Sequence, residues 1–424
     1  MATLRIIFFV TLLAAYVLAA PAPAKIKKRS FKVPRHINAP VHARGLNGGA
    51  AVRKVFNKYN LKGGFIAQSK TGEFTPFTKA NAANSSANGT GTVAANPGEN
   101  AALFLSPVDI GGQTLNLDFD SGSSDLWVFS TNLPKQATVG HGVYDPAQST
   151  TFKNMTGAQW QISYGDGSGA AGTVGTDAVT IGGVTVQNQA VELASAVSRS
   201  FVQDTNTDGL VGLAFSTLNT VNDGTKKTPQ KTFFDNVMGD LDLPVFTADL
   251  DPDGTGVYEF GKIDATKFQG EMAWIPVNAS SGFWQFPSAK FAVGDQVFEN
   301  PSASQAIADT GTSLLLVDQP VADAYYSQVK GAQLNAQVGG FIYPCDATLP
   351  DMSVAIGDTY MAKIPGNQIT FAAVDQANTT CFGGVQGNQG AGLQIYGDTM
   401  FKAQFVAFNG GNSSLGFGEK PPVA

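Results

Sequence analysis

A short sequence element occurs twice in this chain and constrains the fold more than any other feature. D-S-G-S-S at 120–124 and D-T-G-T-S at 309–313 each follow an apolar run and precede another. A second element, two apolar or aromatic residues before a glycine, recurs at 210–212 and 395–397. Its glycine comes 92 residues after the first aspartate and 88 after the second. Two lobes built to one plan, each supplying one aspartate, are therefore expected.

The remaining sequence pattern favours β-strands. Hydrophobic residues make up 43% of the chain and charged residues 14%, which suits a soluble globular protein. Short alternating runs broken by Gly, Asn and Asp predict strands with tight turns. The clearest runs lie at 114–119, 159–164, 178–186 and 256–260. Helical patterns are confined to 232–239, 322–329 after Pro320, and 52–61. The sequence predicts an all-β, bilobal fold with a cleft between pseudo-twofold-related lobes.

The N-terminal part of the chain has the order of a secretory leader. Arg5 precedes an apolar run at 6–18, and small residues follow. We predict a signal peptide at 1–19, with a membrane anchor as the alternative. Residues 20–88 are predicted to be a basic propeptide and linker. The linker is inferred from the stretch at 80–98, which is rich in Ala, Asn, Ser, Thr and Gly. The predicted lobes are 89–275 and 276–424.

Charge is distributed unevenly along the chain. Residues 1–89 hold 14 Lys and Arg and one acid, a net +13, whereas the remainder carries −19. A basic head on an acidic body suggests pairing within the molecule, although a basic segment without a function is the alternative. An acidic body would repel phosphate, so nucleic acid is not an expected partner. No segment after the leader is apolar enough to span a membrane.

Cysteines and glycosylation signals both fit passage through the secretory pathway. The two cysteines, Cys345 and Cys381, are expected to form one disulfide. Six N-x-S/T signals predict candidate glycosylation sites. They begin at Asn84, Asn88, Asn154, Asn278, Asn378 and Asn412.

Several kinds of catalytic site are disfavoured by residue counts. Only three histidines occur, and His141 alone lies in the body, where it is expected in a surface loop. A histidine-rich metal site is therefore excluded. The acidic stretch at 249–254 starts like a calcium loop, but Phe260 stands where such a loop needs a glutamate. We expect neither metal nor cofactor.

Paired carboxyl groups remain as the catalytic candidates. One D-[ST]-G triplet is a weak signal, but here its context and spacing repeat together. Peptide hydrolysis needs a base to activate water and an acid to protonate the leaving amine. Two adjacent carboxyl groups can share one proton and supply both, as aspartic proteases illustrate.

These motifs together resemble the pepsin family, particularly the secreted fungal enzymes of the penicillopepsin and aspergillopepsin type. The resemblance covers about Leu103 to Gly418. It implies that Asp120 and Asp309 are the catalytic pair. It also implies that the residues after each aspartate cross-link the two loops and hold the carboxylates. Those supporting residues are Ser121, Gly122, Ser123, Thr310, Gly311 and Thr312.

The resemblance also implies a flap that closes over the substrate. The residues at 164–168 match the tip of a hairpin in which Tyr164 covers the cleft, held by a hydrogen bond to Trp127. Without the family, a glycine-rich hairpin with an ordinary core aromatic is the simpler interpretation. Asp166 would accept Lys before the scissile bond. The expected flap and substrate-binding residues are Tyr164, Gly165, Asp166, Ser168, Trp127 and Ile307.

Three further matches complete the resemblance. The segments 208–213 and 395–398 correspond to those that support the two catalytic loops. The Cys345–Cys381 pair corresponds to the single disulfide of the fungal members. Lys58 and Tyr59 match a propeptide pair whose lysine bridges the catalytic carboxylates in precursors, which implies a latent zymogen.

The sequence therefore predicts a secreted, monomeric, self-activating aspartic endopeptidase that acts on proteins and peptides in acid. It would prefer large apolar residues around the scissile bond and tolerate Lys before it. The alternative is an inactive relative that binds peptides or inhibits other enzymes. A two-carboxylate glycosidase is the third possibility, but the paired loops and flap do not fit it. Delivery to an acidic vacuole is the alternative to extracellular secretion.

Overall fold

The computed structural model describes residues 29–35, 48–59, 105–163, 168–252, 256–375 and 377–421. The expected leader at 1–19 and most of the expected linker lie outside these residues. So do three flap residues and two candidate glycosylation sites: Tyr164, Gly165, Asp166, Asn84 and Asn88.

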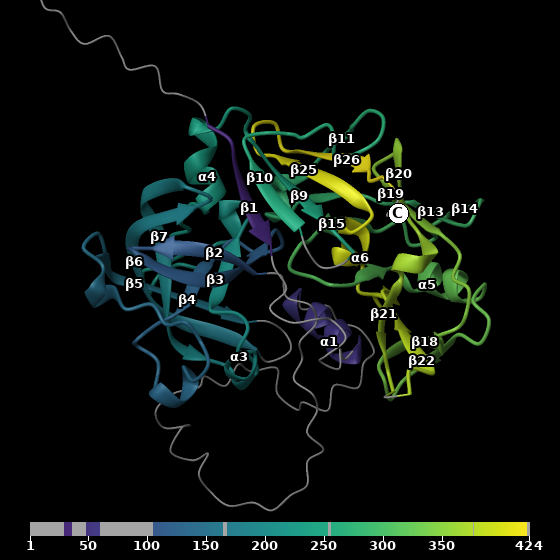
Figure 1. Ribbon diagram of the computed structural model, residues 1–424, viewed down its shortest axis with the longest axis horizontal. Coiled ribbons are helices and arrows are strands. Elements are labelled where there is room, and N and C mark those ends of the chain that lie inside the picture. The colour runs from purple at the N-terminus through teal and green to yellow at the C-terminus, as the bar shows by residue number, and fades with distance from the viewer. Residues whose placement is uncertain are drawn as a thin grey trace, which may run out of the picture.

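Strands dominate the described chain and form five sheets, which confirms the all-β prediction. A seven-stranded sheet forms most of the first half of the body (Figure 1). Its order is β2 (Leu105–Ile110), β3 (Gln113–Asp120), β8 (Gly209–Gly212), β4 (Leu126–Phe129), β7 (Val184–Val197), β6 (Gly169–Ile181) and β5 (Lys153–Ser163).

A six-stranded antiparallel sheet joins the two halves of the molecule. It takes strands from the start, middle and end of the chain, drawn in purple, teal and yellow (Figure 1). Its order is β1 (Phe31–Arg35), β10 (Gly256–Phe260), β9 (Val245–Leu250), β25 (Gln404–Asn409), β26 (Ser414–Glu419) and β11 (Ala273–Pro276). β1, from the expected propeptide, forms one edge. The expected lobe boundary at 275/276 falls inside β11.

Three smaller sheets form the second half of the body. The five-stranded one runs β12 (Gln285–Pro287), β15 (Gln305–Ala308), β24 (Leu393–Tyr396), β16 (Leu315–Val317) and β23 (Val385–Gly387). One four-stranded sheet runs β14 (Gln296–Glu299), β13 (Lys290–Val293), β19 (Met352–Ile356) and β20 (Tyr360–Ile364). The other runs β17 (Gln333–Asn335), β18 (Gly340–Pro344), β22 (Thr380–Gly383) and β21 (Thr370–Ala373).

The described helices are short. They are α1 (Gly48–Lys58), α3 (Arg199–Gln203), α4 (Phe233–Val237), α5 (Gln319–Tyr326) and α6 (Asp398–Phe401). Single 3-10 turns lie at Lys135–Ala137, Pro146–Gln148, Ser216–Leu218, Met238–Asp240, Ala279–Ser281 and Gly366–Gln368. None of these helices is long and apolar enough to cross a membrane.

Local sequence explains most of these element boundaries. Thr232 accepts a hydrogen bond from the Asp235 amide and caps α4. Pro320 lies in the first turn of α5, where its missing N–H costs nothing. The prediction of one strand at 178–186 was wrong, because Gly182 and Gly183 adopt positive φ and form a turn between β6 and β7.

The sequence repeat is also a repeat of strand pairing. In the first half, β8 pairs parallel with β3 and antiparallel with β4, and β4 pairs parallel with β7. In the second half, β24 pairs parallel with β15 and antiparallel with β16, and β16 pairs parallel with β23. Gly212 and Gly397 occupy matching places, and a Cβ on either would clash with the facing loop backbone. Both glycines therefore permit the same close approach.

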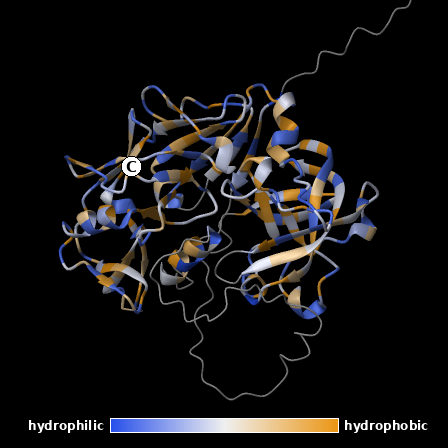
Figure 2. Cartoon of the chain, turned by 180° about the vertical axis from the view of Figure 1, so that it is seen from behind, coloured by the Kyte–Doolittle hydropathy of each residue, from blue (hydrophilic) through white to orange (hydrophobic). Residues whose placement is uncertain are grey.

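Aromatic side chains fill the core where the halves meet. Phe246 of β9 stacks on Phe408 of β25 with ring centroids 4.4 Å apart, and Trp284 packs edge-on against both. Hydrophobic residues recur along the strands (Figure 2), and the central strands β4 and β16 are hydrophobic throughout. The core is therefore continuous across the six-stranded sheet and supports the loops that emerge from either side.

The expected disulfide and four candidate glycosylation sites lie on the described chain. Cys345, just after β18, is bonded to Cys381 of β22, which confirms the predicted pairing. Four candidate asparagines are exposed, so attached glycans would meet no steric obstacle, and their modification stays a prediction. They are Asn154, Asn278, Asn378 and Asn412.

Candidate active site

Asp120 and Asp309 meet between the two halves of the body. Asp120 ends β3 and Asp309 follows β15, so the matching strands deliver the two carboxyl groups to one place. The supporting segments behave as expected from the repeat. The Leu213 amide donates to the Asp120 carbonyl at 2.8 Å, and the Asp309 amide donates to the Tyr396 carbonyl at 3.0 Å. Both aspartates are buried, 1% and 0% exposed respectively.

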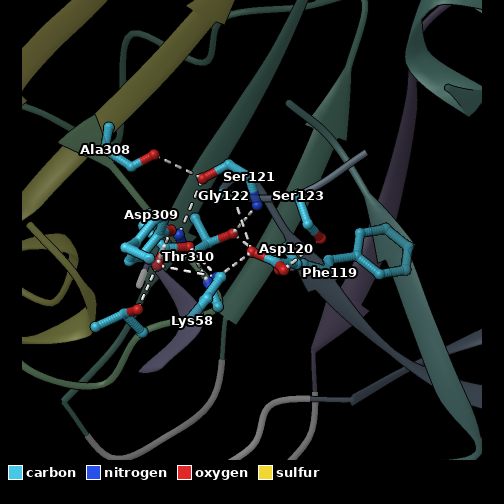
Figure 3. A network of polar contacts seen from close by, with 12 residues as sticks. Lys58, Phe119, Asp120, Ser121, Gly122, Ser123, Ala308, Asp309 and Thr310 are labelled. Carbon is cyan, nitrogen blue, oxygen red and sulfur yellow. Dashed lines mark hydrogen bonds and ion pairs between the residues drawn. The ribbon is translucent and has the colours of Figure 1, made fainter. Parts of the chain in front are cut away.

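The two loops are cross-linked by a symmetrical set of four hydrogen bonds (Figure 3). The Ser121 amide donates to Thr310 Oγ1 at 3.0 Å, and the Thr310 amide donates to Ser121 Oγ at 2.9 Å. Each hydroxyl then donates across the interface, Ser121 to the Ala308 carbonyl at 2.9 Å and Thr310 to the Phe119 carbonyl at 2.8 Å. The two hydroxyl groups therefore fix the relative position of the loops.

Each carboxyl group is held by its own loop in the same way. The Gly122 amide donates to Asp120 Oδ1 at 2.9 Å, and Ser123 Oγ donates to Asp120 Oδ2 at 2.5 Å. In the second loop, the Gly311 amide donates to Asp309 Oδ1 at 3.0 Å. The Thr312 hydroxyl donates to Asp309 Oδ2. These donors orient both carboxyl groups before any substrate binds.

Glycine is needed two residues after each aspartate because the two loops approach so closely. A Cβ on Gly122 would clash with the Asp309 carboxyl group, and one on Gly311 would clash with that of Asp120. Any larger residue would push the two carboxyl groups apart. The glycine of the D-[ST]-G pattern is therefore required by the close approach of the two loops.

Lys58, at the C-terminus of α1, lies between the two aspartates. Its Nζ is 2.7 Å from Asp120 Oδ1, 2.8 Å from Asp309 Oδ1 and 3.0 Å from Asp309 Oδ2. Tyr59 donates its hydroxyl to Asp309 Oδ2 at 2.6 Å. The structure thus brings together the four residues that the sequence analysis associated with latency, and the carboxyl pair is fully occupied by protein groups.

An apolar contact holds α1 over the second half of the body. Its inner face and the sheet beneath form one buried cluster. The members are Ala51, Val52, Val55, Phe56, Ile307, Leu314, Leu316, Ile342, Phe382 and Ile395. Ile307 is 0% exposed at the centre of β15. Its expected contact with substrate therefore stays a prediction.

The environment shifts the acidities of the three central groups. Burial raises the pKa of the Asp120 carboxyl above its usual value and outweighs the opposing effect of Lys58. Burial also acts to raise the pKa of Asp309, but the Lys58 ammonium and the hydroxyl donors hold it below its usual value. Although burial acts to lower the pKa of Lys58, its two carboxylate partners raise it above its usual value. Lys58 is therefore charged.

A cavity of about 120 Å³ lies beside Tyr59, next to the first loop. It is lined by Lys58, Tyr59, Gly122, Ser123, Ser124, Asp125, Ile162, Ser163, Leu218, Thr220 and Phe283. The Tyr59 and Phe283 rings meet edge-to-face with centroids 5.5 Å apart. Across the described ranges, no group of three His, Cys, Asp or Glu side chains could hold a metal ion.

The remaining predicted residues are only partly described. Trp127 lies in a buried aromatic cluster with Trp160 and Phe201, and its Nε1 has no hydrogen-bond partner among the described residues. Its expected bond to Tyr164 lies outside those residues. Ser168 is buried at the start of the strand that follows the flap.

His141 differs from the prediction of a simple surface residue. Its ring stacks on Phe129 with centroids 3.9 Å apart. Nδ1 lies 2.9 Å from the Thr207 carbonyl and Nε2 lies 3.3 Å from the Val202 carbonyl. The glycines on either side suggested an exposed loop, but they do not indicate that the histidine side chain packs against the rest of the protein.

Comparison with known proteins agrees with this geometry. The profile of the eukaryotic aspartyl protease family matches residues 104–420. An aspergillopepsin A-like aspartic endopeptidase of Aspergillus fumigatus is 46% identical, over 98% of this chain and 99% of the relative. Aspergillopepsin-1 of Aspergillus flavus is 50% identical, over 78% and 80% of the two chains. Penicillopepsin-1 of Penicillium rubens is 49% identical, over 77% and 80%.

The chain therefore belongs to the eukaryotic aspartyl protease family. Within that family it is an aspartic endopeptidase of the aspergillopepsin and penicillopepsin type, and its substrates are proteins and peptides.

We predict that Thr310→Val lowers both stability and activity. Valine matches threonine in shape but removes the acceptor of the Ser121 amide and the donor to the Phe119 carbonyl. Each buried group left unpaired costs about 1–3 kcal/mol. Thermal unfolding and peptide hydrolysis in acid would measure the loss. Thr310→Ser keeps the hydroxyl and is the matched control. Equal stability and activity of the valine variant and wild type would contradict the assigned role.

Proposed function

We propose that this chain is the precursor of a secreted endopeptidase that works in acid and uses Asp120 and Asp309 as its catalytic pair. The observation that carries the proposal is the contact of Lys58 with both carboxyl groups, which lie at hydrogen-bonding distance from one cation. A cation that contacts both carboxylates keeps them near enough for one small group, such as a water molecule, to contact both once the cation leaves. That proximity is what a two-carboxyl mechanism requires.

The proposed chemistry uses water as the nucleophile. One carboxylate accepts a proton from water, and its protonated partner donates to the substrate, so the amine leaves as a neutral group. The donors from the Gly122 and Gly311 amides hold the carboxyl groups in position throughout. The cross-linked loops prevent the pair from separating when their charge changes. No metal is needed for these steps.

Preference for large apolar residues fits the cavity beside the first loop. Three of its lining side chains, Ile162, Leu218 and Phe283, are apolar. Tyr59 already places an aromatic ring against Phe283, so a substrate aromatic side chain would fit there. Tolerance of Lys before the scissile bond would depend on Asp166, by resemblance to the fungal enzymes.

Latency of the precursor follows from the Lys58 contacts. Asp309 has a pKa below its usual value, so its contribution to propeptide binding is present above that usual value and is lost as the pH falls. Asp120 has a raised pKa, so it takes up a proton earlier as the solution is acidified. Protonation would therefore first weaken the Asp120 contact and then the Asp309 contact. Acid would release α1 and permit self-cleavage.

The contact between the basic head and the acidic body is partly described. Besides Lys58, Lys32 of β1 lies 3.6 Å from Glu259 and 3.5 Å from Asp264. These exposed pairs add little individually, because water and salt screen them. The buried Lys58 contacts and the apolar face of α1 would supply most of the inhibition. A leader, extracellular secretion and a monomeric state complete the proposal; an acidic vacuole is the alternative destination.

Substituting either aspartate tests the proposed mechanism. In Asp120→Asn or Asp309→Asn, an amide of the same size can neither accept nor donate the proton, so activity should fall by at least about a hundredfold. Hydrolysis of denatured haemoglobin from acid to neutral pH, with and without pepstatin, would measure this. Wild-type enzyme should be active only in acid and blocked by the inhibitor. Retained hydrolysis in either variant would reject the dyad.

Substituting Lys58 tests the proposed latency. Without its cation the carboxyl pair loses the propeptide contact, so Lys58→Ala should convert itself at higher pH than wild type. The pH at which half of the precursor is cleaved in a fixed time is the measurement. Lys54→Ala removes a neighbouring cation of the same helix, for which no ion pair is found among the described residues, and is the control. Unchanged latency of Lys58→Ala would count against the capping role.

Asp166 tests the proposed tolerance of Lys. Removing the carboxylate should abolish cleavage after Lys and leave cleavage after Phe, because only the cationic side chain needs a charged partner. Two peptides that differ solely in that residue, incubated with wild type and Asp166→Ala, give the comparison. If both peptides are cut by the variant at wild-type rates, Asp166 has no such role.

A further inference from the structure

A second pair of carboxyl groups lies directly behind the first loop. Asp125 precedes β4, and Glu192 lies on β7, the parallel neighbour of β4 in the sheet. Trp127 stands opposite Glu192 in the register of these strands. Asp125 is 2% exposed and Glu192 is 1% exposed. Neither residue belongs to the D-[ST]-G element, and the sequence pattern did not point to them.

Asp125 accepts several hydrogen bonds that favour its anion, although burial raises the pKa of its carboxyl group above the usual value. Its Oδ1 accepts hydrogen bonds from the Thr220 amide at 2.8 Å, the Thr220 hydroxyl at 2.8 Å and Asn219 Nδ2 at 3.3 Å. Its main-chain carbonyl accepts from the Gly212 amide at 2.9 Å. Asp125 therefore connects the first loop to β8 and to the 219–220 turn.

Glu192 has the opposite surroundings. Its Oε1 accepts from Asn219 Nδ2 at 2.8 Å, but its buried Oε2 meets no donor among the described residues. The Glu192 and Asp125 carboxyl groups lie next to each other, because Asn219 Nδ2 donates to both of them. Two carboxylates cannot bond to each other without a proton on one of them. Burial raises the pKa of Glu192 well above its usual value, and the Asp125 charge raises it further, so Glu192 carries the proton.

No cation among the described residues of the body offsets this pair. Among the described residues, neither carboxyl group forms an ion pair with Lys, Arg or His. The polar neighbours are Asn219 and Thr220, and the nearby charge that acts on Asp125 is another anion, Asp120. Lys58 lines the same cavity as Asp125, but it leaves with the propeptide in the proposed activation.

We propose that Asp125 and Glu192 share one proton in the active enzyme, and that this proton positions the first loop and sets the upper pH limit of catalysis. Both are positioning residues that act through Asp120, and the proposal rests on the proposed function of Asp120. Loss of the proton leaves two buried anions in contact, with a third charge close by. The pair then repels, and the loop that orients Asp120 loses its support from β7.

The direction of the pH effect follows from the raised pKa values of the two carboxyl groups. A carboxyl group whose pKa is higher in the folded than in the unfolded chain costs no stability in acid. As the pH rises above the usual pKa of glutamate, the unfolded chain ionises more readily than the folded one. The free energy of unfolding therefore decreases toward neutral pH. The enzyme is held together best under the conditions in which the catalytic pair also works.

Glu192→Gln tests this proposal. The amide copies a protonated carboxyl group: Oε1 accepts from Asn219 and Nε2 donates to Asp125, and Asp125 is left as the one group of the pair that titrates. The full-length chain is converted in acid, and kcat/KM for a fluorogenic peptide is measured across the pH range. We expect the upper limb of the profile to move up by about one pH unit, roughly a tenfold gain near neutrality relative to acid. Asp125→Asn, which also leaves one titratable group, should move it in the same direction.

Glu299→Gln is the matched control, because this side chain is 75% exposed on β14 and pairs only with Lys290 among the described residues. Its pH profile should coincide with that of wild type. An upper limb of Glu192→Gln that coincides with wild type overturns the proposal, as does loss of its activity in acid. Absence of hydrolysis by wild type at every pH would instead reject the proposed function.

Discussion

The four hydrogen bonds between Ser121 and Thr310 and the opposing backbone are the constraint on which this molecule depends. They lie where two halves of one chain meet, and every partner in them is buried. Because both hydroxyl groups donate and accept, neither loop can move alone without leaving polar groups unpaired. The carboxyl geometry, the fit of Lys58 and the support from β8 and β24 all require this fixed distance between the loops.

Much of this arrangement could be predicted because a repeat carries long-range information. Matching motifs at 120–124 and 309–313 implied matching strands, and β3, β8 and β4 have direct counterparts in β15, β24 and β16. The recurrence of the second element at 210–212 and 395–397 implied equivalent supporting segments, and Gly212 and Gly397 occupy matching places in the structure. The disulfide followed from there being two cysteines.

Other features could not be predicted because they depend on contacts between residues far apart in sequence. The Gly182–Gly183 turn lies within a run whose hydrophobic and polar residues alternate as in a single strand. His141 lies between glycines, yet its ring packs on Phe129. Asp125 and Glu192 are 67 residues apart in the sequence, and neither stands in a distinctive local pattern. Their chemistry depends on burial and on a shared proton. No periodic pattern in a sequence indicates that a carboxyl group on a strand is buried.

In the proposed latent precursor, the covalent connection between α1 and the body would determine how inhibition ends. While the chain is intact, α1 and the surface beneath it are parts of one molecule, and the effective concentration of the helix is independent of dilution. A single cut anywhere between Tyr59 and β2 makes the same contact bimolecular. Dissociation then gains translational entropy, and the released segment competes with substrate only at its actual concentration. In the proposed activation, one broken peptide bond would thus shift the equilibrium from the closed state almost entirely toward release of the helix.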